Sequence, residues 1–116
     1  MKLVIAGSRN LEIDEYLIDE LCRTMLDDDP TEIVSGGSGS VDLSGEDYAL
    51  LKGLPIEQFL ADWDKFGKSA GPIRNRAMAE YGDALLLVWD GSSKGSANMK
   101  DEMEKLGKPV YEIILN

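Results

Sequence analysis

The stretch Ser35-Gly36-Gly37-Ser38-Gly39-Ser40 is the most informative part of this chain. It joins a short apolar run at 32–34 to a segment with helical character at 41–52. A glycine-rich turn between a strand and a helix lets backbone N–H groups approach an anion closely, and the helix N-terminus adds a favourable dipole. The stretch therefore predicts a strand–turn–helix unit that suits a phosphate.

The same alternation of short apolar runs and helical segments continues on both sides of this turn. We expect strands near 2–6, 32–34, 56–60, 84–89 and 110–115, helices near 13–26, 41–52, 72–81 and 97–106, and a polar connection between 61 and 71. Such alternation is typical of parallel βαβ units. The predicted fold class is α/β, a three-layer Rossmann-like doubly wound parallel sheet of about five strands in the order 3-2-1-4-5. The run 84–89 is apolar on both faces, which indicates a central strand.

Composition limits the kind of protein. With 116 residues, of which 43% are hydrophobic, the chain is predicted to be one domain, 1–116. It has no apolar run that could cross a bilayer and no signal-peptide pattern, so we expect a cytoplasmic protein. A net charge of −10 disfavours polymeric nucleic acid and membranes as partners but allows a small anion in a local pocket. A homo-oligomer is left open.

The residue types also limit the chemistry. The chain has no histidine, which excludes Ser-His-Asp and Cys-His catalysis and the usual zinc sites. Its one cysteine, Cys22, has apolar neighbours one helical turn away and is predicted to be a buried thiol. We expect no metal site in the protein itself and leave open a magnesium ion that accompanies a phosphorylated ligand.

Polar residues and glycines follow several of the expected strands. Ligands of open parallel sheets bind at the carboxyl ends of the strands, where the strand order reverses. In the order 3-2-1-4-5, the ends of the first, second and fourth strands meet in one crevice. The candidate ligand-binding residues there and in the nearby polar connection are Gly7, Ser8, Arg9, Ser35, Gly36, Gly37, Gly39, Asp42, Asp62, Trp63, Arg74, Asn75, Asp90, Ser93, Lys94, Gly95 and Ser96.

Each candidate also has a structural alternative. Asp42 could cap the second helix or contact ribose hydroxyls, and Trp63 could cover the sheet edge or stack on a base. Ser93 and Ser96 could be turn and cap residues, although hydroxyls and N–H donors at the end of a central strand favour ligand contact.

Two common nucleotide motifs fail on this chain. The run 37–42 begins like a dinucleotide fingerprint, but Asp42 occupies the place of the third glycine. Gly67-Lys68-Ser69 looks like the end of a P-loop, but Asp62 occupies the place of its first glycine. We therefore expect neither an ordinary NAD fingerprint nor ATP hydrolysis by a P-loop.

A more specific set of motifs covers nearly the whole chain. In order, they are Gly7-Ser8-Arg9, Ser35-Gly36-Gly37 with Gly39 and Asp42, Ala61-Asp62-Trp63, the run 70–76 with Met78, Asp83-Ala84, and Asp90-Gly91 with Ser93 and Gly95-Ser96. Together they resemble the YspA-like branch of the SLOG superfamily. That resemblance implies a Rossmann-like domain that binds nucleotides or nucleotide-derived ligands such as ADP-ribose-like molecules. The superfamily also includes DprA and the Lonely Guy phosphoribohydrolases, which cleave nucleoside monophosphates.

The enzyme alternative can be tested against the phosphoribohydrolase motifs. Arg74 takes the position of their functional arginine, so it would be the catalytic residue if the chain is an enzyme. Met99 takes the position of their catalytic glutamate, and a thioether can neither stabilise an oxocarbenium-like transition state nor act as a base.

The sequence therefore favours binding or sensing of a nucleotide-derived ligand, with Arg74 as the main charged contact to its phosphate. An N-glycosidase or phosphoribohydrolase is the first alternative, and a structural interaction domain without a ligand is the second.

Overall fold

One five-stranded sheet runs through the molecule. The computed structural model describes residues 1–115 and orders the strands β3-β2-β1-β4-β5. Every neighbouring pair of strands is parallel. The strands are β1 (Lys2–Gly7), β2 (Glu32–Ser35), β3 (Ile56–Gln58), β4 (Ala84–Trp89) and β5 (Val110–Ile114). The predicted fold class and strand order are confirmed.

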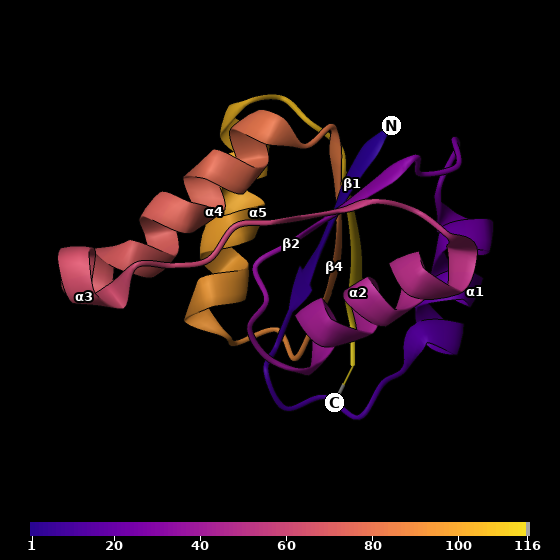
Figure 1. Cartoon of the computed structure of the whole chain (residues 1–116), viewed down its shortest axis with the longest axis horizontal. Coiled ribbons are helices and arrows are strands. Elements are labelled where there is room, and N and C mark those ends of the chain that lie inside the picture. The colour runs from indigo at the N-terminus through magenta and orange to yellow at the C-terminus, as the bar shows by residue number, and fades with distance from the viewer. Residues whose placement is uncertain (116) are drawn as a thin grey trace.

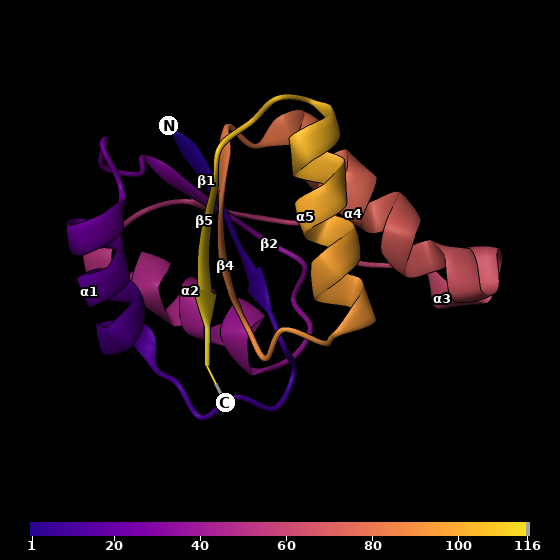
Figure 2. The same ribbon diagram turned by 180° about the vertical axis from the view of Figure 1, so that it is seen from behind.

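Helices cover both faces of this sheet. The helices α1 (Glu15–Met25) and α2 (Ser40–Lys52) lie on one face, and α4 (Ala70–Tyr81) and α5 (Lys94–Lys105) lie on the other (Figure 1, and from behind in Figure 2). The strand order reverses between β1 and β4 because the chain adds β2 and β3 on one side and β4 and β5 on the other. No helix among residues 1–115 is long and apolar enough to cross a membrane.

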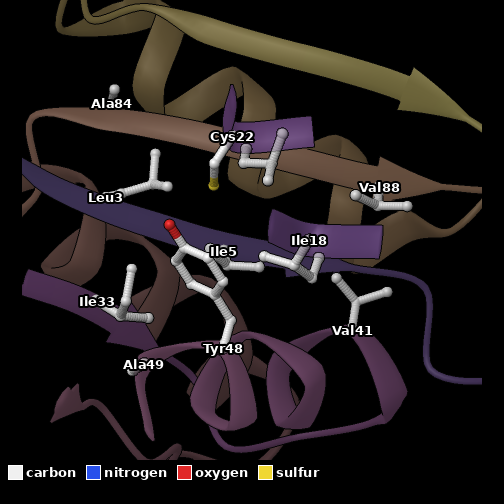
Figure 3. Packing of buried hydrophobic residues seen from close by; sticks show 11 residues of the cluster. Leu3, Ile5, Ile18, Cys22, Ile33, Val41, Tyr48, Ala49, Ala84 and Val88 are labelled. Carbon is white, nitrogen blue, oxygen red and sulfur yellow. The ribbon is translucent and has the colours of Figure 1, made fainter. Parts of the chain in front are cut away.

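The core has two halves, one on each face. All six residues of β4 are buried, as expected for a strand between two neighbours. Under α1 and α2, Ile5 packs with Ile18, Cys22 and Tyr48 (Figure 3). The Cys22 thiol is buried, as predicted, and burial raises its pKa. The other face packs α4 and α5 against the sheet through buried methionines and aliphatic residues.

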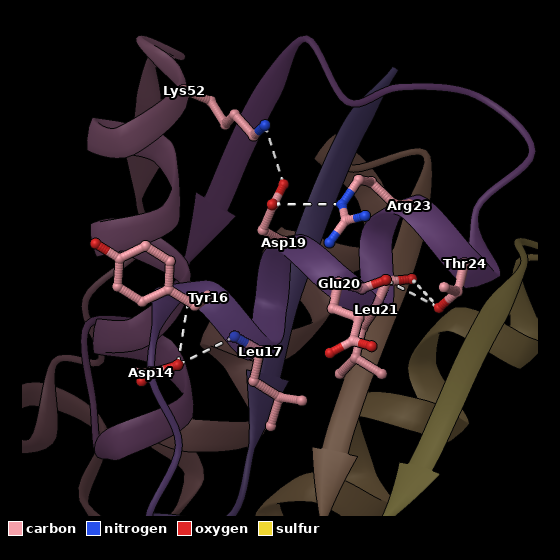
Figure 4. Close-up of polar contacts among 9 residues, drawn as sticks. All are labelled: Asp14, Tyr16, Leu17, Asp19, Glu20, Leu21, Arg23, Thr24 and Lys52. Atoms are coloured by element: carbon pink, nitrogen blue, oxygen red, sulfur yellow. Dashed lines mark hydrogen bonds and ion pairs between the residues drawn. The ribbon is translucent and has the colours of Figure 1, made fainter.

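Two of the helix starts that differ from the expected ones are explained by capping side chains. The first was expected from 13 but starts at Glu15, because the Asp14 carboxylate accepts hydrogen bonds from the N–H groups of Tyr16 (3.1 Å) and Leu17 (3.0 Å) (Figure 4). The helix expected from 97 starts at Lys94, because the Ser93 hydroxyl accepts from the Ser96 N–H at 3.4 Å. In both cases a capping side chain fixes the helix start.

The prediction of a polar connection between 61 and 71 is also wrong in part. This stretch contains the short helix α3 (Trp63–Phe66) and a 3₁₀ turn, η1 (Gly67–Ser69), and α4 then begins at Ala70, before Pro72. Asp62 caps α3 by accepting a hydrogen bond from the Lys65 N–H at 3.1 Å. The preceding strand β3 ends at Gln58 instead of 60. As a result, α3 projects beyond the main body of the fold (Figure 1).

Candidate functional site

A cavity of about 390 Å³ lies at the carboxyl ends of the strands, between the sheet edge and the first turns of α2, α4 and α5. Its volume falls within the usual range for small-molecule sites, about 300–1,000 Å³. Its lining residues are Ala6, Gly7, Arg9, Ser38, Asp42, Trp63, Lys68, Gly71, Pro72, Arg74, Asn75, Met78, Ser93, Lys94, Gly95, Ser96, Asn98 and Met99.

The structure brings together many of the predicted site residues, though not all of them. Those that line the cavity are Gly7, Arg9, Asp42, Trp63, Arg74, Asn75, Ser93, Lys94, Gly95 and Ser96. Those that lie outside its lining are Ser8, Ser35, Gly36, Gly37, Gly39, Asp62 and Asp90. Of the glycine turn and the start of α2, only Ser38 and Asp42 therefore line the cavity among the described residues.

Cations dominate the charge of the cavity wall. Arg9, Lys68, Arg74 and Lys94 line it, and Asp42 is the one acidic residue among the lining residues. None of these four cations forms an ion pair with a carboxylate within residues 1–115. In a chain with 22 acidic and 12 basic residues, four cations without ion-pair partners make the wall of this cavity locally positive, which favours an anion over a cation.

The glycine turn is held by its own hydrogen bonds. The Gly37 N–H donates to the Ser35 hydroxyl at 3.0 Å, and the Ser38 N–H donates to Asp42 Oδ2 at 3.0 Å. Gly39 has a φ of 88°, and a Cβ there would lie 2.7 Å from the Arg9 Cα. Glycine at 39 thus allows α2 to begin directly against the Arg9 backbone.

Arg74 is fixed by backbone carbonyls from two neighbouring segments. Its guanidinium donates to the Gly36 carbonyl at 2.9 Å and to the Phe59 carbonyl at 3.4 Å, and its Nε donates to the Asn75 amide oxygen at 2.9 Å. The Asn75 amide nitrogen in turn donates to the side-chain oxygen of Asn98 at 2.9 Å. This chain of contacts ties the glycine turn, α4 and α5 together beneath the cavity.

Asp42 is a buried carboxylate beside this arginine. Only 6% of the residue is exposed. A Cβ placed on Gly36 would lie 2.6 Å from the Arg74 guanidinium and 3.0 Å from Asp42 Oδ2, so both groups meet at the turn. Burial raises the pKa of Asp42 from 3.8 to about 7, against the opposing effects of the Ser38 N–H and Arg74. Asp42 is therefore poised to change charge near neutral pH.

The N-terminus of α5 forms the opposite wall. Ser93 is the N-cap and Lys94 the first helical residue. Ser96, in the first turn, is 3% exposed, and its hydroxyl oxygen is buried without a hydrogen-bond partner among the described residues. An unpartnered buried hydroxyl and a lysine at the positive end of a helix dipole favour an anion over a cation.

Sequence reasoning missed eight lining residues. Lys68 and Gly71 lie in the stretch expected to be an irregular connection, and the short helix α3 and turn η1 bring them to the cavity. Met78, Met99 and Ala6 supply apolar wall, and their helical or strand spacing indicates only core packing. The others are Ser38, Pro72 and Asn98. The signals available were the quoted turn for Ser38 and the family motifs for Gly71, Pro72, Met78 and Met99.

A second, smaller cavity adjoins the first. It has a volume of about 280 Å³ and lies between the loop that follows β1 and the loop that follows β4. Two of its residues, Arg9 and Ser93, also line the larger cavity. The others are Ser8, Asn10, Leu11 and Asp90, so two predicted residues outside the first cavity lie in the second.

The described residues do not form a metal centre of their own. Within 1–115, no group of three or more acidic, cysteine or histidine side chains is placed to hold a metal ion. A divalent cation at this site would therefore depend on ligand phosphates for most of its coordination.

These features define a Rossmann-like α/β protein with a cationic cavity at the switch point of its sheet. No family model matches the chain. It is 30% identical over 119 residues to the Gene 61 protein of Mycobacterium phage D29, covering 94% of this chain and 93% of that protein. The chain belongs to the same family as this phage protein.

A solved structure also has this fold. The X-ray structure of DNA processing protein A (DprA) from Streptococcus pneumoniae matches with a TM-score of 0.76 and 19% sequence identity. The match covers 99% of this chain, which spans 50% of the DprA chain. DprA belongs to the superfamily that the sequence motifs resemble, and at this identity the likeness concerns the fold.

Proposed function

We propose that this chain binds a nucleotide or nucleotide-derived ligand in the larger cavity and acts as a sensor or carrier. The observation that carries the proposal is the charge of the cavity. Arg9, Lys68, Arg74 and Lys94 line it without ion-pair partners in the described part of a chain whose net charge is −10. Unpaired cations in so acidic a protein indicate an anionic ligand.

The phosphate of this ligand is best placed at the N-terminus of α5. There the Ser96 hydroxyl lacks a partner, and Lys94 adds a positive charge. The glycine turn is a weaker candidate because the N–H groups of Gly37 and Ser38 already donate within the protein. Arg74 lines the cavity, but it is held by carbonyls of the turn and of Phe59, so it supports the wall and adds positive charge to it.

The base of the ligand fits against the apolar part of the wall. Trp63, which is 51% exposed, lines the cavity mouth, and Met78, Met99 and Pro72 complete an apolar surface. Exposed tryptophan rings provide a stacking surface for a planar base. Asp42 can accept hydrogen bonds from ribose hydroxyls when it is ionised.

We also propose that the chain belongs to the YspA-like branch of the SLOG superfamily. The support is the order of its motifs from Gly7-Ser8-Arg9 to Gly95-Ser96, together with a fold like that of DprA. A magnesium ion would enter with the ligand's phosphates, since the protein offers no preformed acidic cluster among residues 1–115.

A nucleotide N-glycosidase is the second candidate function. Met99 lines the cavity where the related hydrolases carry glutamate, which argues against catalysis. Asp42 is the observation in favour, because it brings a buried carboxylate with a pKa of about 7 into the same cavity. Steady release of free base from a nucleoside monophosphate would establish this alternative.

A thermal-shift screen tests the proposal. The panel contains AMP, ADP, ADP-ribose, NAD, cyclic nucleotides and the other nucleoside monophosphates, and mass spectrometry of each mixture reports any free base. A single-stranded oligonucleotide is included because the structural relative is described as a DNA processing protein. We expect saturable stabilisation by a small phosphorylated ligand without turnover.

Calorimetry with the best ligand then locates the phosphate. Lys94→Gln removes one charge at the α5 N-terminus and should weaken binding about tenfold. Lys105→Gln is the matched control, because Lys105 lies on the same helix but is exposed and paired with Asp101 at 3.1 Å. Equal affinities of the two variants would show that the phosphate does not bind at the N-terminus of α5. If none of the ligands stabilises the protein in the thermal-shift screen, the alternative of a structural interaction domain without a ligand is favoured.

A further inference from the structure

We propose that Asn98 selects the base of the ligand, favouring an oxo base such as guanine, hypoxanthine or uracil over an amino base such as adenine or cytosine. Asn98 lies on α5 and lines the larger cavity. The proposal rests on the proposed function, because it needs a nucleotide whose base lies against the apolar wall of this cavity.

Two hydrogen bonds of fixed direction determine the orientation of the neighbouring Asn75 amide. The Arg74 Nε–H can only donate, and it donates to Asn75 Oδ1 at 2.9 Å. The Gly95 carbonyl can only accept, and it accepts from Asn75 Nδ2 at 3.3 Å. Because each end of this amide faces a partner of fixed polarity, its oxygen and nitrogen cannot exchange places.

The orientation of Asn75 in turn determines that of Asn98. Asn75 Nδ2 donates to Asn98 Oδ1 at 2.9 Å, so the amide oxygen of Asn98 is turned toward α4. The amide nitrogen of Asn98 has no hydrogen-bond partner among residues 1–115, and it is not buried. Since Asn98 lines the larger cavity, it offers a ligand there its N–H donors, while its acceptor faces Asn75.

The surroundings of this donor suit a base. The proposed phosphate site lies at the first turn of α5, from Ser93 to Ser96, and Asn98 follows in the second turn. Beside it in the cavity wall are Met99 and, one turn beyond Asn75 on α4, Met78. Both methionines are buried and apolar. A base that packs its face against apolar surface presents its polar edge to the donor beside that surface.

A donor that stands alone distinguishes bases by one ring substituent. Guanine, hypoxanthine and uracil carry an oxo oxygen that accepts a hydrogen bond, where adenine and cytosine carry an amino group that donates. An asparagine with both ends of its amide free can pair with adenine, because it donates to a ring nitrogen and accepts from the amino group. Asn98 has its oxygen turned toward Asn75, so an amino group opposite its N–H would leave two donors facing each other.

Calorimetry with matched nucleotide pairs tests the proposal. IMP and AMP differ in the oxo or amino group at one ring carbon and in the proton on the adjacent nitrogen, and so do UMP and CMP. In each pair that binds, we expect the oxo member to bind about tenfold more tightly. Equal affinities, or a preference for the amino member, in the pair that binds most tightly would overturn the proposal and leave the proposed nucleotide function intact.

Two substitutions assign the preference to Asn98. Asn98→Asp keeps the size of the side chain and can still accept from Asn75, but it presents a carboxylate oxygen to the cavity in place of the N–H group. The preference should therefore reverse, so that AMP binds more tightly than IMP, while both affinities fall because of the added negative charge. Asn98→Ala removes the donor and should bring the ratio of the two affinities close to one.

Asn10→Asp is the matched control. It makes the same chemical change at an exposed asparagine that lies outside the lining of the larger cavity, so it should keep the parent's preference for IMP. An oxo preference that survives both Asn98→Asp and Asn98→Ala would overturn the proposal, since another group would then discriminate between the bases. If no nucleotide binds the parent protein, the proposed function fails and this proposal fails with it.

Discussion

Asp42 is the residue whose position is hardest to explain by folding alone. It is 6% exposed, accepts one backbone N–H at 3.0 Å, and forms no ion pair within residues 1–115. A buried carboxylate with so few partners destabilises a protein when it is charged. Its place in the wall of a cationic cavity fits the ligand proposed above.

The stability of the protein should therefore depend on pH through Asp42. Its pKa is raised from 3.8 to about 7 by burial. Between these values the unfolded chain releases a proton that the folded protein keeps, so the unfolding free energy falls as pH rises and levels off above about 7. Asp42→Asn removes this pH-dependent loss of unfolding free energy. The variant's unfolding free energy, relative to that of the parent, should therefore be about 2–3 kcal/mol higher at about pH 8 than at about pH 5. Urea unfolding of both proteins at the two pH values measures this effect. If the variant and the parent differ in unfolding free energy by the same amount at both pH values, Asp42 does not titrate in this window.

Arg74 has a structural task that its sequence position does not reveal. Arg74→Ala leaves the buried Gly36 carbonyl and the Phe59 carbonyl without this donor, so we expect the unfolding free energy to fall by about 1–3 kcal/mol without any ligand. Arg76→Ala is the control, because Arg76 lies on the same helix but is exposed and pairs only with Glu80. Urea unfolding decides the matter, and equal stability of the two variants would return Arg74 to a role in ligand binding alone.

The glycine turn illustrates what the sequence can predict at this scale. Three glycines within 36–39 predict a tight turn between a strand and a helix, and Gly37 and Gly39 do have positive φ. The sequence does not indicate which N–H groups remain free, because that depends on Ser35 and Asp42 folding back onto the turn. The sequence thus predicted the turn itself. Which of its neighbouring residues line the cavity became known only from the structure.

At the scale of elements, the end of α4 depends on a single lysine. Lys108 Nζ donates to the carbonyls of Ala79 (2.7 Å) and Glu80 (3.1 Å) in the last turn of the helix and to that of its C-cap, Gly82 (2.7 Å). A lysine there satisfies carbonyls that have no partner within the helix and opposes the negative end of the helix dipole. This contact joins the end of α4 to the segment that leads into β5.

Removing this lysine should loosen α4 from its C-terminal end. We expect Lys108→Met to lower the unfolding free energy by about 1–2 kcal/mol and to speed amide hydrogen exchange in the last turn of α4. Lys105→Met removes a lysine from exposed ion pairs on α5 and should change stability by less than about 0.5 kcal/mol. Faster exchange spread evenly over the whole chain, with none concentrated at α4, would contradict the capping role.

The elements were predictable where the sequence carries a clear signal. The strand β4 is apolar throughout and α1 and α5 have an apolar face, whereas α2 and α4 have weak apolar patterns and were expected from the glycines and prolines at their ends. The helix α3 has four residues and buries none of them, so it carries no periodic signal. Its start depends on the Asp62 cap, a local hydrogen bond that a scan for apolar spacing does not detect.

At the scale of the whole molecule, the handedness of the βα crossovers predicts the strand order. That order also predicts that Arg9 and the loop at Ser93–Ser96 meet, since they follow β1 and β4, which are neighbours in the sheet. The approach of Lys68 could not be predicted this way, because it depends on the path of the chain between β3 and α4. The strand order thus predicts which residues meet at the strand ends. The positions of residues in connections outside the sheet cannot be predicted from it and are known only from the structure.

Salt should have opposite effects on the stability of the protein and on its affinity for a ligand, because the molecule as a whole is acidic and its cavity is cationic. The chain carries 22 acidic and 12 basic residues, so its surface charges repel one another at low ionic strength. Raising sodium chloride from about 0.02 M to about 0.5 M shortens the screening length from about 20 Å to about 4 Å and should raise the unfolding free energy of the free protein. The same salt should weaken binding of a nucleotide ligand, because it screens the attraction between phosphate and the cations Arg9, Lys68, Arg74 and Lys94. Urea unfolding and calorimetry at the two salt concentrations measure both effects on one sample. Affinity that stays constant while stability rises would mean that these cations do not face the bound anion.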